Sequence, residues 1–275
     1  MEKPQTADMH MHSVYSDGVL TLDELFAKAK LAGLSAISIT DHDTIDGCNE
    51  CYELKNKYGI DYLTGIEFSC FEETREFHLL GYHFDPDYAP LKKHLKEFRQ
   101  ARYVRAEKIL QKLVKLGRPV EMDLVLELAG KAPIIRPHIA QAMFRNGHVK
   151  SVKEAFQKYL GDWKPAYAPK KIFPVENAIK LVNNSGGVAS LAHPGSFLSQ
   201  DALYRMIQSG LDGIEVIHPM HDESLRNFYH SVASQYWLLE TGGSDYHGNK
   251  EYDEVNFGKL VVPYSIFESI RYHSG

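Results

Sequence analysis

Strand-like and helix-like segments alternate along most of this 275-residue chain, and short connections join them. Near the start, apolar runs at 7–12 and 35–40 flank a helical pattern at 21–32, with Thr21 as its expected N-cap and Gly33 as its stop. Strand–helix–strand units of this kind predict parallel strands. The carboxyl ends of such strands meet on one side of a barrel, where side chains distant in sequence come together.

The alternation continues to the C-terminus after one interruption. A third strand is predicted at 61–69 and a fourth at 76–84, and the chain then reads as almost wholly helical from 88 to 171. Beyond it, further strands are expected at 187–192, 213–217, 236–241 and near 259–262. We therefore predict an α/β fold, with a barrel of residues 1–87 and 172–275 and a helical insertion of residues 88–171.

Composition excludes several classes of function. A net charge of −5 indicates that the chain as a whole is no general binder of polyanions. No apolar run approaches the roughly 20 residues of a membrane helix, and no signal peptide begins the chain, so we expect a cytoplasmic protein without a membrane partner. Three cysteines argue against a disulfide framework, and Cys48 and Cys51 lie in a predicted helix without an assigned role. Nothing indicates a protein partner.

The insertion differs in charge from the rest of the chain. Between Leu91 and Arg118 it carries ten lysines and arginines and two glutamates, which gives a local charge of +8. Apolar residues at helical spacing predict one buried face, so the basic side chains occupy the outer face. This face is either simply solvated or attracts a phosphorylated substrate.

Residues that bind metals follow the predicted strands. His10 and His12 point to the same side of the first strand, because strand side chains alternate. Nine candidates in all lie at or near strand ends: His10, His12, Asp17, His42, Glu67, His78, His193, Asp245 and His247. An ion takes about four to six ligands, so nine predict more than one metal. Nitrogen and oxygen ligands without thiolate suit Mn²⁺, Fe²⁺ or Zn²⁺ and do not choose among them.

The motifs that contain these residues resemble those of the PHP (polymerase and histidinol phosphatase) family of metal-dependent phosphoesterases. They are His10-x-His12-x3-Ser16-Asp17-Gly18, Thr40-Asp41-His42-Asp43-Thr44, Gly65-Ile66-Glu67, His78-Leu79-Leu80-Gly81-Tyr82, Ala192-His193-Pro194 and Ser244-Asp245-Tyr246-His247. The resemblance implies a distorted (β/α)7 barrel and a trinuclear site with two or three divalent ions, Mn²⁺ ahead of Fe²⁺ and Zn²⁺. It would place His10, His12, Glu67 and Asp245 on one metal, Asp17, His42 and His193 on a second, and Glu67, His78 and His247 on the third.

The insertion indicates which branch of the family the chain resembles. Together with Asp17, where some members carry histidine, it is similar to the branch acting on nucleoside 3′,5′-bisphosphates and on the 5′ ends of short RNAs. Arg136, Pro137 and His138 mark a predicted helix start, where free N–H groups favour an anion. We expect the insertion to form a substrate-binding cap in which Arg136 binds phosphate and His138 assists. The alternative is a surface arginine beside a capping histidine.

The expected chemistry is hydrolysis of a phosphate ester. A hydroxide bridging two metals, with Asp17 among their ligands, would attack phosphorus in line while Arg136 holds the non-bridging oxygens. His218, after the strand at 213–217, is the candidate proton donor, and Asp41 or Asp43 would orient a liganding imidazole.

The expected substrate is a small phosphorylated nucleoside or ribose phosphate, with a nucleoside 3′,5′-bisphosphate first and the 5′ ends of short oligonucleotides next. A cyclic ribose phosphate phosphodiesterase and a histidinol phosphatase are alternatives within the same chemistry. A non-catalytic metal-binding module for nucleic acid is the alternative of another class. Such a module would lack several ligands, and the sequence lacks none.

Overall fold

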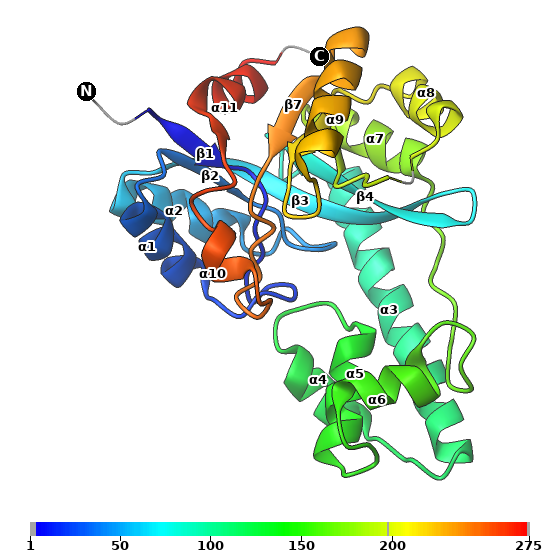
Figure 1. The fold of residues 1–275 in the computed structure, drawn as a ribbon. Helices are drawn as coiled ribbons and strands as arrows, with labels where there is room; N and C mark the ends of the chain where they lie inside the picture. Colours follow the sequence, from blue (N-terminus) through cyan, green and yellow to red (C-terminus); the bar gives the residue numbers. More distant parts are fainter. Residues whose placement is uncertain (1–3, 197, 274–275) are drawn as a thin grey trace. The chain divides into compact units, whose positions relative to one another are not determined.

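The computed structural model describes residues 4–196 and 198–273, which divide into two compact units. The insertion unit is Lys93–Lys171, and the barrel unit is the rest (Figure 1). The barrel strands are β1 (Thr6–Asp8), β2 (Ala36–Ile39), β3 (Asp61–Glu72), β4 (Arg75–Tyr82), β5 (Val188–Ala192), β6 (Gly213–Ile217), β7 (Leu239–Gly242) and β8 (Val262–Pro263). Its helices are α1 (Leu22–Ala32), α2 (Cys48–Tyr58), α7 (Val175–Asn184), α8 (Gln200–Gln208), α9 (Glu223–Tyr236), α10 (Asp253–Asn256) and α11 (Tyr264–Arg271).

The strands form one eight-stranded sheet in the order β7-β6-β5-β4-β3-β2-β1-β8. The pairs β1–β2, β2–β3, β5–β6 and β6–β7 are parallel. In contrast, β4 is antiparallel to both β3 and β5. The reason is local, because only the turn at Glu73 and Thr74 joins β3 to β4. Just past β1, the Met9 N–H donates to the O of Gly242, the last residue of β7, at 3.2 Å, which nearly closes the sheet into a barrel. The predicted distorted barrel is confirmed.

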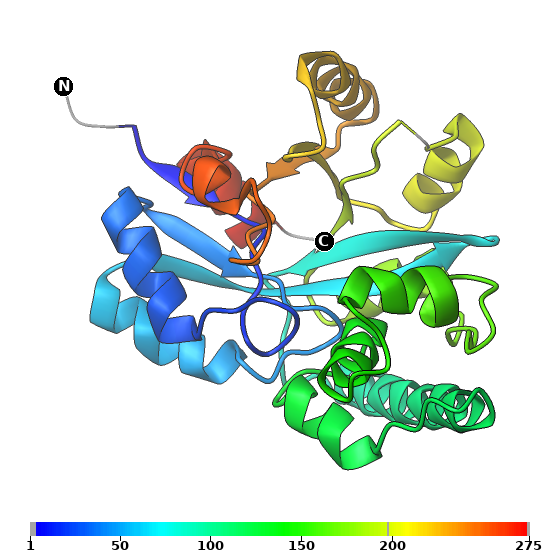
Figure 2. The same ribbon diagram turned by 60° about the horizontal axis from the view of Figure 1, so that its bottom comes forward.

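Helix packing around the barrel follows the apolar pattern of the sequence. Figures 1 and 2 show α1 and α2 together on one outer side and α7, α8 and α9 on another. The predicted N-cap of α1 is confirmed, because the Thr21 hydroxyl accepts the Glu24 N–H while the Glu24 side chain accepts the Thr21 N–H. Gly33 ends the helix in the left-handed conformation.

Several strands differ from their predicted ranges at the ends, and two of these differences are informative. The first strand was expected to reach His12, but β1 ends at Asp8, and the chain continues as extended backbone with Met11 in a single bridge to Tyr246. The seventh was expected from Tyr236, but α9 includes Tyr236, and Trp237 then takes a φ of 54°. In both places, tertiary pairing and packing rather than the local apolar pattern set the boundary.

The insertion unit is helical, with a core of its own. α3 (Ala89–Lys115) begins just before the unit, and α4 (Met122–Ala129), α5 (Arg136–Arg145), α6 (Val152–Ala155) and a π-helical turn, η1 (Phe156–Leu160), follow. Their apolar side chains pack into one cluster around Ile109, Leu113 and Met143. No helix among the described residues combines the length and apolar character needed to cross a membrane.

Candidate metal centre

The strands and the segments that follow them bring the nine predicted ligands into one region of the barrel unit. His10 and His12 follow β1, His42 follows β2, Glu67 and His78 lie on the paired strands β3 and β4, His193 follows β5, and Asp245 and His247 follow β7. Asp17 comes from the loop after His12. Their ring and carboxylate contacts join residues up to 235 positions apart in the chain, such as His12 and His247. Seven of the nine residues therefore come together from segments that follow strands, whereas Glu67 and His78 lie within β3 and β4.

Glu67 lies at the centre of this group and is almost completely buried. Its two carboxylate oxygens lie 2.8–3.3 Å from nitrogens of five imidazoles: His10, His12, His42, His78 and His193. Burial by itself raises the pKa of this carboxyl, but the surrounding histidines hold the pKa well below its usual value. Glu67 is therefore an anion that can bridge cations.

Asp245 supplies a second buried carboxylate close to the first. Its Oδ1 lies 3.4 Å from His10 Nε2 and 3.3 Å from His12 Nε2. Burial opposes ionisation, yet the neighbouring imidazoles of His12 and His218 keep the pKa of Asp245 well below its usual value. Its other oxygen accepts from Lys250 Nζ at 2.9 Å.

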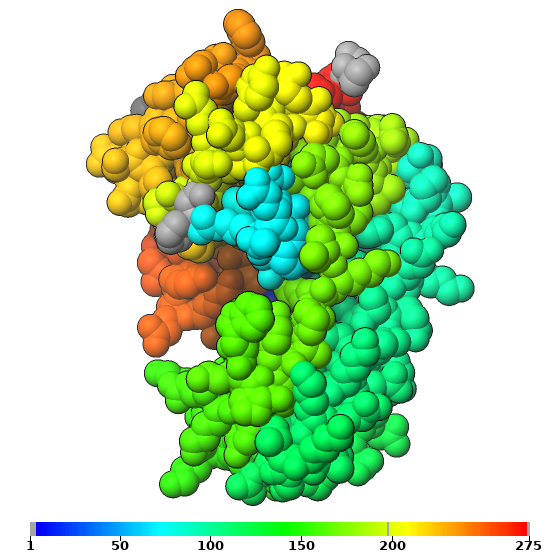
Figure 3. All heavy atoms as spheres, turned by 90° about the vertical axis from the view of Figure 1, so that its right-hand side faces the viewer, coloured from blue at the N-terminus to red at the C-terminus, as the bar shows by residue number. Residues whose placement is uncertain are grey.

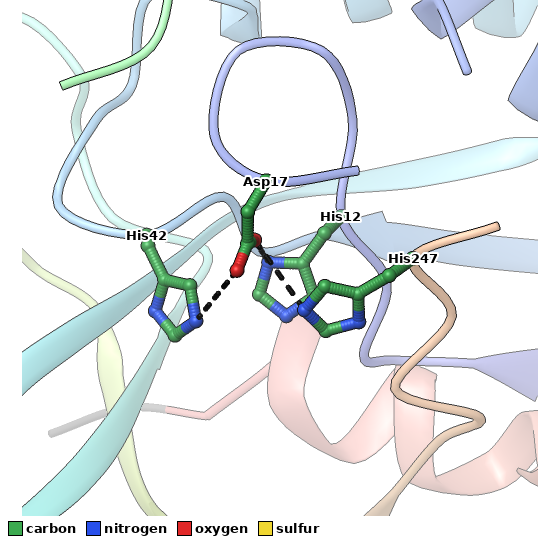
Figure 4. A group of neighbouring side chains, drawn as sticks. All are labelled: His12, Asp17, His42 and His247. Atoms are coloured by element: carbon green, nitrogen blue, oxygen red, sulfur yellow. Dashed lines mark ion pairs between the residues drawn. The ribbon is translucent and has the colours of Figure 1, made fainter. Parts of the chain in front are cut away.

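Asp17 forms the third anionic position, between His42 and His247 (Figure 4). Its Oδ1 lies 3.3 Å from His247 Nε2 and 3.8 Å from His12 Nδ1, and its Oδ2 lies 4.0 Å from His42 Nε2. Although burial raises the Asp17 pKa, these histidines lower it overall. Burial lowers the pKa of His42 to about 4, so this imidazole is neutral and has a lone pair for a metal.

The donor set fits divalent cations. Four groups of side chains place their ligand atoms within 4.8 Å of one another. They are His12, Asp17, His42 and His247; His10, His12, Glu67 and Asp245; His10, Glu215 and His218; and His42, Glu67 and His78. Three buried atoms of these groups, His12 Nε2, Asp17 Oδ1 and His42 Nδ1, have no hydrogen-bond partner within the described chain. Buried polar atoms of this kind are satisfied by ligating a metal.

The distribution of two histidines differs from the one the family resemblance implied. His193 was grouped with Asp17 and His42, but its Nε2 lies 2.9 Å from Glu67 Oε1. His247 was grouped with Glu67 and His78, but it lies beside Asp17 and His12. The group of His10, His12, Glu67 and Asp245 is found as expected. The strand order explains the exchange, because His193 follows β5 beside β4, whereas the loop after β7 lies along the loop after β1.

Glu215, on β6, is a functional candidate that the sequence analysis missed. Its Oε1 lies 2.9 Å from His10 Nδ1, and its Oε2 accepts the backbone N–H of His193 at 2.7 Å. The side chain is completely buried, so it fixes both the ring of His10 and the start of the loop at His193. A signal was present, because Glu215 is a charged residue inside the apolar run Gly213–Ile217.

Asp41 or Asp43 was expected to orient an imidazole, but the carboxylate that contacts a ring in this way is Glu215. Asp41 instead accepts from the Ser13 N–H at 2.8 Å, the Ser13 hydroxyl at 2.6 Å and the Ser16 hydroxyl. These bonds hold the loop that carries Asp17. Asp43 accepts the Ser69 N–H at 2.9 Å and so ties the loop after β2 to β3.

Left-handed backbone occurs at three non-glycine residues of the site. Asp43 has a φ of 52°, His193 of 26° and Asp245 of 49°. A side chain in this region costs on the order of 1–3 kcal/mol, and such residues concentrate at functional sites. Gly243 allows a related close approach, because a Cβ there would lie 2.4 Å from the backbone nitrogen of His10. The backbone conformation therefore helps to position the side chains of the site.

His218 lies within the same region and is completely buried. Burial lowers its pKa, which favours the neutral ring. Its Nδ1 accepts the Met220 N–H at 3.0 Å, so the ring proton is on Nε2, 3.5 Å from Asp245 Oδ2. Such a ring is better suited to orient Asp245 than to release a proton.

Arg136 and His138 lie in the insertion unit, at the start of α5. Arg136 Nη1 donates to Leu160 O at 3.1 Å and to Asp162 Oδ1 at 2.6 Å, and its side chain is 20% exposed. His138 Nδ1 accepts the Ile135 N–H at 3.3 Å and so caps the helix, as the alternative interpretation expected. Pro137 is the second residue of α5, within the predicted helix start.

The family of the chain is shown by comparison with known proteins. The PHP domain model matches residues 8–173, so the chain belongs to the PHP family. A structure from Bifidobacterium adolescentis, described as a candidate metal-dependent phosphoesterase, is 30% identical, with a TM-score of 0.87 over 98% of this chain and 96% of that one.

Named relatives act on phosphate esters. A 5′-3′ exoribonuclease of Haemophilus influenzae is 31% identical over 87% of this chain and 89% of its own. A 3′,5′-nucleoside bisphosphate phosphatase of Chromobacterium violaceum is 30% identical, covering 89% and 88%. A phosphoribosyl 1,2-cyclic phosphate 1,2-diphosphodiesterase of Eggerthella lenta is 31% identical, covering 88% and 94%. The chain is a metal-dependent phosphoesterase, and the predicted enzyme class is confirmed, whereas the non-catalytic alternative is set aside.

Proposed function

We propose that this phosphoesterase hydrolyses a small phosphorylated nucleoside, with a nucleoside 3′,5′-bisphosphate as first candidate and the 5′ ends of short RNAs as second. The observation that carries the proposal is the packing of five imidazoles around Glu67, with Asp17 and Asp245 beside them. The relatives that act on bisphosphates and on RNA support this choice of substrate.

The nine predicted residues would hold two or three divalent ions, Mn²⁺ before Fe²⁺ and Zn²⁺. Within them, one group offers two carboxylates and two imidazoles, and another one carboxylate and three imidazoles. Imidazole and carboxylate ligands suit these metals. When bound, the ions would lower the pKa of water and neutralise charge on the phosphate.

The remaining residues of the chain act on the substrate and on the ligands. Arg136 would bind a phosphate in place of Asp162, assisted by His138, because a guanidinium matches phosphate oxygens in geometry. Lys250 is 30% exposed, and although burial lowers its pKa, Asp245 raises it, so it brings a positive charge to the rim of the site. His218 would act by orienting Asp245 through its Nε2–H.

A substrate panel with the Mn²⁺-loaded protein tests the proposal. It contains a nucleoside 3′,5′-bisphosphate, a ribose 1,2-cyclic phosphate, histidinol phosphate and a 5′-phosphorylated short RNA. We expect hydrolysis of the bisphosphate to be fastest and to disappear in Asp17→Asn, while Asp46→Asn, an exposed neighbour in the loop before α2, retains it. Absence of hydrolysis across the panel would overturn the proposal.

Arg136 has a separate test. Arg136→Lys should raise KM for the bisphosphate by about 10–100-fold, the value of one or two charge-assisted hydrogen bonds. Arg145→Lys is the matched control, since Arg145 lies on the same helix and pairs with Glu127. An unchanged KM in Arg136→Lys would show that Arg136 does not bind the substrate phosphate.

A cyclic ribose phosphate is the alternative substrate, after the bisphosphate and the short RNAs. The relative from Eggerthella lenta supports it, because it is as similar to this chain as the exoribonuclease relative is. Preference for the cyclic diester in the panel would select this alternative and keep the metal centre unchanged.

A further inference from the structure

A groove runs along the outer face of α3 within the insertion unit. It encloses about 900 Å³ between one face of the helix and the segment that ends the unit. Its lining residues are Lys93, Lys96, Glu97, Gln100, Ala101, Val104, Arg105, Lys108, Pro169, Lys170 and Lys171. Figure 3 shows the atoms of α3 in teal.

The groove has a strongly positive lining. Six of its residues are lysine or arginine and one is glutamate, so its formal charge is +5 in a protein whose total is −5. Lys93, Lys96 and Lys108 are exposed. A one-signed row of exposed charges repels itself, so a polyanion that neutralises the row gains free energy by binding there.

Contacts within the unit hold the groove open and define its two walls. Arg105 Nε donates to Ala168 O at 2.8 Å, and Lys112 Nζ donates to the carbonyl of Tyr167. Lys171 Nζ lies 3.8 Å from a carboxylate oxygen of Glu97. The segment after η1 is therefore fixed alongside α3, and the groove exists before any ligand binds.

The dimensions suit a short single strand. From Lys93 to Lys108 the helix rises about 22 Å, at 1.5 Å per residue. A strand that rises about 3.4 Å per nucleotide would place about six phosphates over this length. The apolar residues of the lining are Ala101, Val104 and Pro169, and no aromatic ring lines the described groove. The groove therefore offers charge and little base stacking, which predicts binding without sequence preference.

We infer that the α3 groove binds the phosphate backbone of single-stranded RNA. The inference builds on the proposed function, because it extends the substrate from a mononucleotide to the 5′ region of an RNA chain. None of the metal ligands lines the groove, and neither does Arg136, so it is a binding site separate from those already described. A nucleoside bisphosphate has too few charges to span it.

Salt-dependent binding tests the groove. The probe is a fluorescently labelled single-stranded RNA of 12 nucleotides, and the protein is kept metal-free with EDTA so that no cleavage occurs. Lys93→Gln, Lys96→Gln and Lys108→Gln are combined in one variant. Single strands lose about 0.7 in the slope of log K against log salt for each phosphate contact, so the slope should fall by about 2 and affinity at 0.1 M salt by about a hundredfold.

The matched control removes the same charge from the same unit. It combines Lys115→Gln, Lys150→Gln and Lys153→Gln, three exposed lysines outside the groove. We expect its slope to stay within about 0.7 of the wild-type value. Equal losses in the two triple variants, or no loss in the groove variant, would overturn the proposal.

A variant that should raise RNA affinity provides a further test, because misfolding would lower the affinity and not raise it. Glu97→Gln removes the one acidic side chain of the described groove, so RNA affinity should rise about fivefold at 0.1 M salt. Glu107→Gln, on the same helix but outside the groove, should change affinity less. A poly-aspartate chain of equal charge that binds as tightly as the RNA would overturn the assignment to nucleic acid.

The groove and the proposed function fail separately. Hydrolysis of the nucleoside bisphosphate should be unchanged in all groove variants, since none touches the metal centre. If the wild type hydrolyses no phosphate ester, the proposed function fails, while the metal-free binding assay still decides the groove.

Discussion

The metal centre and the α3 groove use charge in opposite ways. In the barrel unit, carboxylates and imidazoles are buried and lie within about 4 Å of oppositely charged or metal-binding neighbours. In the insertion unit, exposed lysines are spread along α3. Buried charges act strongly over short distances, so each residue of the centre matters individually. Exposed charges are screened and act by their number, so residues of the groove are exchangeable.

Loss of Glu67 should have the largest effect. Glu67→Gln keeps the size but removes the charge that faces five imidazoles, so bound metal should be lost and activity should fall by more than about a thousandfold. Metal content by mass spectrometry and kcat measure this. Glu73→Gln, in the turn of the same hairpin, is the control and should retain both. A fully metallated, active Glu67→Gln protein would break the comparison.

Glu215 should give an intermediate effect, because it acts through His10 and the loop at His193. Glu215→Gln should weaken metal binding by about 10–100-fold, as is usual for carboxylates that orient ligating imidazoles. Metal titration by calorimetry measures it, with Glu240→Gln, a partner of His230 on β7, as control. Unchanged metal affinity with lower thermal stability would make Glu215 purely structural.

Metal loading should release protons. Burial lowers the pKa of His12 and His78, but the neighbouring carboxylates raise these pKa values to about 9 and about 10, so both rings carry a proton at pH 7 without metal. A metal must displace those protons, so its affinity should fall about tenfold per displaced proton for each pH unit from pH 8 to pH 6. Calorimetry in two buffers of different ionisation enthalpy counts them. Metal binding that is independent of pH would contradict the pairing.

The smallest effect is expected at Asp162 in the insertion unit. Asp162→Asn removes the exposed carboxylate that holds Arg136, so KM for the bisphosphate should fall a few-fold if Arg136 binds phosphate. Asp123→Asn, on α4, serves as control. A raised KM would show that Asp162 is needed to position Arg136, which would sharpen the division between the two units.

Sequence patterns predicted the residues of the site best where a polar side chain directly follows an apolar strand. Candidate ligands such as His42 and Asp245 could be found because polar residues follow apolar strands, and strand ends converge. The role of Glu215 could not be predicted, because the contact that defines it is with His10, which lies far away in the sequence. The exchange of His193 and His247 depended on strand order, which no local pattern encodes.

Boundaries failed for a related reason. The apolar alternation after Asp8 is real, and Met9 and Met11 are buried as it requires, but regular pairing stops because the loop after β7 leaves the ladder. The helical insertion was foreseen from its lack of strand-like runs. The groove was not foreseen, because the segment at 169–171 that forms its second wall lies far from α3 in sequence.

The left-handed backbone at Asp43, His193 and Asp245 has an evolutionary consequence. At each position glycine would relieve the backbone, but at His193 and Asp245 it would also delete a candidate ligand. Selection for a more stable fold and selection for a working centre therefore oppose each other at these residues. Lineages that adapt to heat must gain their stability elsewhere, in caps, cores and surface charges, and leave these strained residues in place.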